Sequence, residues 1–176
     1  GRARPDWRIL TRALLAGIDE EAAASMIPVP FPHEPDAQGR MLAMRARAMA
    51  HLAAGGLVAL FPAGGVAAAR RPWGPAVEGE WSAFTAKMIR LSGAAVVPVR
   101  FPGANSRAYQ VAACVSPTLR QGLLLHEIAR AFDGPQRPHV GEAIPFEAME
   151  PRLGDPRAAM AWLRARTLAL GPGVGA

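Results

Sequence analysis

The sequence has little cysteine, little lysine and no long uninterrupted apolar run, and the first and last of these shortages exclude certain kinds of protein. Its single cysteine, Cys114, excludes an internal disulfide framework and is typical of a reducing compartment; it lies in an apolar run, where we expect it to be buried. No group of histidines and cysteines has the spacing of a metal site. The longest uncharged run, residues 52–69, contains Pro62 and four glycines, so it predicts a strand and a loop rather than a membrane span.

The remaining composition is that of a globular, basic protein. Apolar residues make up 51% and charged residues 19% of the 176 positions, which favours one folded domain. The net charge is +6, and Lys87 is the one lysine among twenty basic residues. A basic surface favours phosphates, anionic membranes or acidic carriers as partners. We expect no nucleic acid among them, because no basic run is interleaved with aromatic residues.

Strand-like and helix-like segments alternate along the chain. The pattern predicts strands at residues 7–10, 26–31, 57–61, 94–101, 109–115 and 139–144, and helices at residues 11–24, 37–54, 80–92, 119–132 and 156–170. Asp155 is the expected N-cap of the last helix, with Pro156 at its first position. This alternation predicts a single α/β domain over residues 1–170, with a mixed, largely parallel sheet flanked by helices, and a flexible tail at residues 171–176.

Two loops are candidates for a binding site. In α/β sheets ligands bind beyond the carboxyl ends of the strands. The strands predicted at residues 57–61 and 94–101 both read as buried, and they lead into glycine-bearing loops at Phe61–Gly65 and Pro102–Arg107. If the two strands are neighbours, the loops share one edge of the sheet, and we expect Arg107 to face the same cleft as Gly64.

An ordered series of short blocks adds a family resemblance. The blocks are MIPV at residues 26–29, FPAG at 61–64, VVPVRFPGANSRAYQ at 96–110, LRQGLLLHEIARAF at 119–132 and HVGEAIPFE at 139–147. Together, over roughly residues 4–162, they resemble the glycerolipid acyltransferases of the lysophosphatidate-acyltransferase type, in particular their bacterial hemolysin-like and ornithine-lipid branch. FPAG alone is a short string of low specificity, and the order of the blocks carries the resemblance.

The resemblance implies an activity, partners and a location. Such an enzyme transfers a fatty acyl group from an acyl thioester, either acyl-CoA or acyl-ACP, to the hydroxyl of a lysophospholipid or a lyso-ornithine-type lipid. It needs no cofactor beyond this co-substrate. The implied partners are the lysolipid acceptor, the acyl carrier protein or CoA thioester, and an anionic membrane surface. The implied location is cytoplasmic, peripheral to the inner face of the membrane.

The family's catalytic dyad, a histidine followed five positions later by an aspartate, does not occur in this sequence. None of the four histidines has an aspartate at that spacing: His33, His51, His126 and His139. We assign no catalytic residue, and because the chain begins with Gly1 rather than methionine, we expect the dyad to lie upstream and the domain to be N-terminally truncated. The alternative is a non-catalytic module of the same fold that binds lipids or their headgroups. An α/β-hydrolase is disfavoured because the sequence has no Gly-x-Ser-x-Gly elbow.

The candidate substrate-binding residues come from the two loops: Phe61, Pro62, Ala63, Gly64, Gly65, Asn105, Ser106 and Arg107. Gly64 and Gly65 would offer backbone N–H groups to a phosphate or an acyl oxygen, or simply form a turn. Asn105 and Ser106 would line the site or only cap the chain, whereas Arg107 suits bidentate recognition of phosphate or carboxylate.

Two further segments have two interpretations each. Arg70 and Arg71 are expected either to bind acidic lipid headgroups or to be a pair of charges exposed to solvent. Trp81, Phe84 and Met88 are expected to pack in the core, and the alternative is that they line a pocket for the acyl chain.

Overall fold

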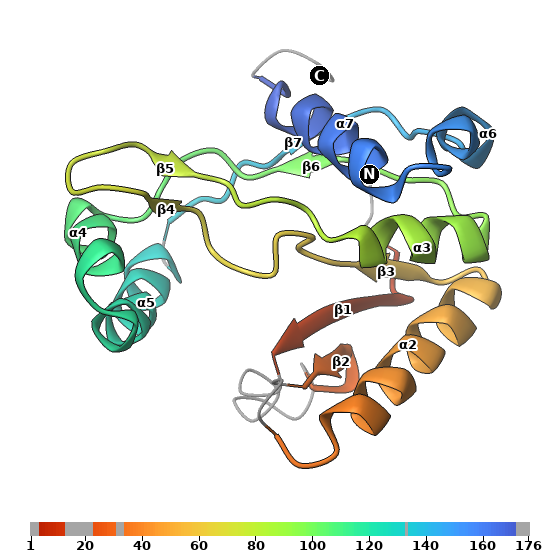
Figure 1. Cartoon of the computed structure of the whole chain (residues 1–176), viewed down its shortest axis with the longest axis horizontal. Helices are drawn as coiled ribbons and strands as arrows, with labels where there is room; N and C mark the ends of the chain where they lie inside the picture. The colour runs from red at the N-terminus through yellow and green to blue at the C-terminus, as the bar shows by residue number, and fades with distance from the viewer. Residues whose placement is uncertain (1–3, 13–22, 31–33, 133, 172–176) are drawn as a thin grey trace. The chain divides into compact units, whose positions relative to one another are not determined.

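The computed structural model describes residues 4–12, 23–30, 34–132 and 134–171. The chain, drawn in Figure 1, divides into two compact units: residues 1–61 with 88–94, and residues 62–87 with 95–176. Both units combine helices with short strands, so the predicted α/β class is confirmed. The described strands form one parallel sheet of three strands and two antiparallel pairs. The expectation of one largely parallel sheet is therefore wrong for the described part of the chain.

The first unit is built on the parallel sheet, whose strands are β1 (Trp7–Arg12), β2 (Met26–Val29) and β3 (Leu57–Ala59). Their order is β2-β1-β3, with Ile9 opposite Met26 and Trp7 opposite Leu57. The three strands predicted in these regions are confirmed, and β2 lies at an edge, where its Pro28 is tolerated. β3 is the other edge strand, and Leu57 is 40% exposed, so its predicted burial on both faces is wrong.

Helix α2 (Ala37–Ala53) covers this sheet and packs on β2 and β3. Its N-cap is Asp36, whose side chain accepts a hydrogen bond from the N–H of Gly39 at 3.3 Å. Met44 and Ala48 are buried on its inner face. The predicted helix at residues 37–54 is confirmed. Most of the helix predicted for residues 11–24 lies outside the described residues; of the described part, residues 11–12 belong to β1 and residues 23–24 are helical.

The second unit contains two antiparallel strand pairs and most of the helices. The pairs are β4 (Ala68–Ala69) with β5 (Ala76–Val77), and β6 (Val99–Arg100) with β7 (His139–Val140). A bridge between Val96 and Ile144 extends the second pair. The strand predicted at residues 94–101 is thus present only in part. It is not parallel, and Val97, Val99 and Phe101 are exposed rather than buried.

The helices of the second unit are α4 (Arg107–Val115), α5 (Pro117–Phe132), α6 (Phe146–Met149), the 3₁₀ turn η2 (Glu150–Arg152) and α7 (Pro156–Leu168). Asp155 caps α7 as predicted, because its Oδ1 accepts from the N–H groups of Arg157 and Ala158. α7 packs on β6 and η2, and the core there includes Met149, Leu153, Met160 and Leu163. The strand predicted at residues 109–115 is wrong, since this segment is helix α4.

Helix α3 (Ala83–Ser92) runs from one unit into the other. Residues 83–87 belong to the second unit and residues 88–92 to the first. The helix ends at Gly93, whose φ of 61° lies in the left-handed region where glycine terminates helices at little cost. The prediction of a helix at residues 80–92 is confirmed, with a start three residues later.

Candidate functional site

The loop at Phe61–Gly65 follows β3 and is open to solvent. Phe61 is 63% exposed, and both Gly64 and Gly65 are exposed. The loop is tied at its start, where the carbonyl of Pro62 accepts a hydrogen bond from the N–H of Ser82 at 2.9 Å. Gly64 has φ 65°, so the backbone itself requires glycine there. Within the described residues neither glycine N–H donates to a protein acceptor, which leaves both free for a ligand or for water.

Asn105 and Ser106 form the start of helix α4. Ser106 is the N-cap, and its Oγ accepts a hydrogen bond from the N–H of Tyr109 at 3.2 Å. The carbonyl of Asn105 accepts from Nε2 of Gln110 at 3.3 Å. The Nδ2 atom of Asn105 is buried without a hydrogen-bond partner in the described structure, so it is out of reach of a ligand at the surface. Ser106 was expected either to line the site or to cap the chain, and the structure shows that it caps α4.

Glu127 of α5 holds this cap in place. It is 8% exposed and accepts a hydrogen bond from the backbone N–H of Ser106 at 3.0 Å and a shorter one from the Ser106 hydroxyl. Burial alone would raise the pKa of the Glu127 carboxyl, but the two bonds from Ser106, helped by nearby Arg130 and His126, lower its pKa below the ordinary value. The carboxylate also lies at the positive end of the α4 dipole. Glu127 therefore fixes α4 against α5.

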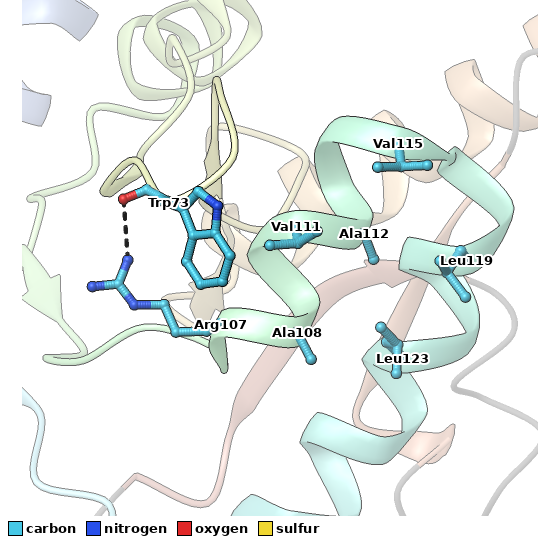
Figure 2. Close-up of a pocket in the computed structure, with 8 residues that line it drawn as sticks. All are labelled: Trp73, Arg107, Ala108, Val111, Ala112, Val115, Leu119 and Leu123. Carbon is cyan, nitrogen blue, oxygen red and sulfur yellow. Dashed lines mark hydrogen bonds between the residues drawn. The ribbon is translucent and has the colours of Figure 1, made fainter.

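Arg107 is the first residue of α4 and lies on its exposed side. One guanidinium nitrogen, Nη1, donates to the backbone carbonyl of Trp73 at 3.3 Å (Figure 2). No carboxylate of the described residues pairs with Arg107. The remaining guanidinium donors are thus available to an anion, and the predicted role of Arg107 in binding one stays a prediction.

The structure does not join the two predicted halves of the site through a sheet. β3 pairs with β1, whereas β6 pairs with β7, so the expectation that the two preceding strands are neighbours in one sheet is wrong. In the described part of the chain no hydrogen bond links residues 62–65 to residues 105–107. A cleft shared by Gly64 and Arg107 stays a prediction.

An open apolar groove of about 430 Å³ lies beside Arg107 instead (Figure 2). It is lined by Trp73, Arg107, Ala108, Val111, Ala112, Val115, Leu119 and Leu123. The α4 residues recur every three or four positions, so they share one side of that helix, and Leu119 and Leu123 do the same on α5. Sequence reasoning missed this groove because it treated residues 109–115 as a strand, in which these side chains would alternate between two faces.

Trp73 stands at the Arg107 end of the groove in an unusual backbone conformation. Arg71, Pro72, Trp73 and Gly74 form a turn closed by a hydrogen bond from the N–H of Gly74 to the carbonyl of Arg71, at 3.0 Å. Proline at the second position and a φ of 68° at the third define a type II turn, whose third position favours glycine. Here it holds a tryptophan that is 75% exposed. A bulky residue with positive φ is rare, and such strain is concentrated at functional sites.

The described histidines do not form a catalytic dyad. Nε2 of His51 lies 2.6 Å from the backbone carbonyl of Asp6, so its ring is occupied within the first unit. His126 is exposed on α5. No three metal-binding side chains come together in the described part of the chain. Cys114, predicted to be buried, is exposed, although its Sγ lies 3.4 Å from the carbonyl of Ala69.

Comparison of the chain with family models, with curated proteins and with solved structures finds no match. None of the described helices is both long enough and apolar enough to cross a membrane.

Proposed function

We propose that this chain binds an anionic single-chain lipid and belongs to an acyltransferase that transfers a fatty acyl group from acyl-CoA or acyl-ACP to the hydroxyl of a lysolipid. The observation that carries the proposal is the apolar groove with Arg107 at one end. Each buried methylene of an acyl chain contributes about 0.8 kcal/mol, and a hydrogen bond to a charged group about 1.5–3 kcal/mol. An apolar tail joined to an anionic head uses both features.

The acyl-transfer step rests on the resemblance of the sequence blocks. In this proposal the lysolipid hydroxyl loses its proton to a histidine upstream of Gly1, its oxygen attacks the thioester carbonyl, and the thiol of the donor leaves with that proton. The free N–H groups of Gly64 and Gly65 are suited to stabilise the oxyanion that forms on the carbonyl oxygen. Arg107 would hold the acceptor headgroup.

A second function deserves the same tests, because one observation favours it. None of the four histidines has an aspartate five positions later. In this second function the chain is a lipid-binding module without acyl-transfer activity, and the groove binds the lipid in the same way.

Binding of monomeric lysophosphatidate to the purified chain tests the groove. We expect Leu119→Asp, in the groove, to weaken binding about tenfold or more, because burying a leucine contributes about 1.5–3 kcal/mol. Leu42→Asp is the matched control, since Leu42 is an exposed leucine of α2 in the first unit. Arg107→Ala should weaken binding by a similar factor, and Arg107→Lys should restore only part of it. Wild-type affinity in Leu119→Asp would rule out the groove.

Acyl transfer from a thioester to the same lysolipid separates the two functions. The chain of 176 residues should show no turnover, because general-base catalysis contributes about 10²–10⁴-fold. A longer protein that includes the expected dyad should be active. Robust turnover by the chain as printed would place the base among its own four histidines, and an inactive longer protein would favour the binding module.

A further inference from the structure

The tip of the β4–β5 hairpin, residues 70–73, combines two arginines with an exposed tryptophan. Arg70 and Arg71 are exposed, and in the part of the chain that the structure describes neither forms an ion pair. Trp73 is 75% exposed in the strained third position of the type II turn.

Hydrogen bonds link the β4–β5 hairpin to helix α4. Arg107 donates to the carbonyl of Trp73, and at the base of the hairpin the N–H of Ala69 donates to Oε1 of Gln110 at 2.7 Å. Figure 1 shows the β4–β5 hairpin beside α4. The hairpin is thus tied to α4, and the indole lies next to Arg107 at the end of the groove (Figure 2).

The chemistry of the tip fits one kind of partner better than others. Tryptophan prefers the headgroup level of a bilayer, and arginines close to an anionic surface each contribute about 1 kcal/mol, or about fivefold in affinity. A protein partner of standard size would cover about 800 Å² on this chain, and four residues with one indole of about 250 Å² fall well short of that.

We infer that residues 70–73 are a docking tip for an anionic lipid bilayer, which brings the Arg107 end of the groove to the membrane surface. The indole lies among the headgroups, and Arg70 and Arg71 contact their phosphates. This inference deepens the proposed function, on which it rests for the identity of the groove's ligand, because it states how a lysolipid would reach the groove: directly from the bilayer.

Co-sedimentation of the whole chain with vesicles tests the tip. We expect binding to phosphatidylcholine vesicles that contain phosphatidylglycerol, and much weaker binding to phosphatidylcholine alone. Arg70→Gln and Arg71→Gln should each lower the affinity about fivefold. Arg157→Gln is the control of equal charge, since Arg157 is an exposed residue of α7. Trp73→Gly should abolish the quenching of tryptophan fluorescence by brominated lipid chains while keeping the turn, whose third position favours glycine.

Several outcomes would overturn the inference. These are equal binding to both kinds of vesicle, an Arg157→Gln effect as large as those at the tip, and self-association of the chain that Trp73→Gly abolishes. The lysophosphatidate binding assay distinguishes a failure of the docking tip from a failure of the proposed function. Arg70→Gln and Arg71→Gln leave the groove intact and should bind lysophosphatidate as the wild type does. A wild-type chain that binds lysophosphatidate but not anionic vesicles would refute the docking tip and leave the proposed function standing.

Discussion

Replacing Trp73 in parallel by glycine and by alanine measures the backbone strain of the type II turn without the indole. Both variants lose the same side chain, so their difference reports only on the residue's φ of 68°. A left-handed φ costs an ordinary residue about 1–2 kcal/mol, whereas glycine loses about 0.5–1 kcal/mol more chain entropy than alanine on folding. The glycine variant should therefore be the more stable by about 0.5–1 kcal/mol.

Urea unfolding at fixed temperature is the assay, read as the free energy of unfolding of each variant. Gly93 provides the reference position, because it has φ 61° and open space where a Cβ would lie. Gly93→Ala should lose stability by the same amount that separates the two Trp73 variants. An alanine variant at position 73 that is as stable as the glycine variant would refute the left-handed conformation, and with it the strain on which the tip's interpretation partly rests.

Two more predictions concern the site and its support. Gly64→Ala should destabilise the protein by about 0.5–1 kcal/mol, because Gly64 has a positive φ. Gly65 has open space around it and no positive φ, so Gly65→Ala should be neutral or should stabilise the protein by up to about 1 kcal/mol. Equal effects of the two substitutions would contradict the described loop. The pKa of Glu127 is lowered in the folded protein, so its ionised form stabilises the fold above the ordinary carboxyl pKa, and this is lost as the pH falls through the folded value. The stability advantage of wild type over Glu127→Gln, measured by urea unfolding, should shrink between about pH 7 and about pH 3, and a constant advantage would show that the Glu127 charge does not matter.

Local signals in the sequence predicted most helices and the strands of the parallel sheet. Asp155 followed by Pro156 predicted the start of α7 correctly, because a cap and its helix are neighbours in the chain. The error at residues 109–115 has a similar local origin. Tyr109, Val111 and Val115 are typical strand residues, yet Ser106 just before them is an N-cap.

The rest of the candidate site depends on contacts that no local signal reveals. Glu127 caps Ser106 from 21 positions away, so only the packing of α5 on α4 identifies it. Proline and glycine at positions 72 and 74 are typical of a turn. They do not reveal that Trp73, the residue between them, has the left-handed φ. Arg107 was predicted to lie in a polar turn after a strand, whereas it is the exposed first residue of helix α4, and its role in binding stays a prediction.

The order of the parallel sheet has a consequence for synthesis of the chain. β1 is the central strand, although it leaves the ribosome before both of its partners. Trp7 pairs with Leu57, so fifty residues must be made before the second ladder can begin, and contacts of such long range slow folding. Until then the edge of β1 that β3 later covers is open to other strands, even after β2 has paired with the opposite edge, and this open edge could pair with a second copy of the chain.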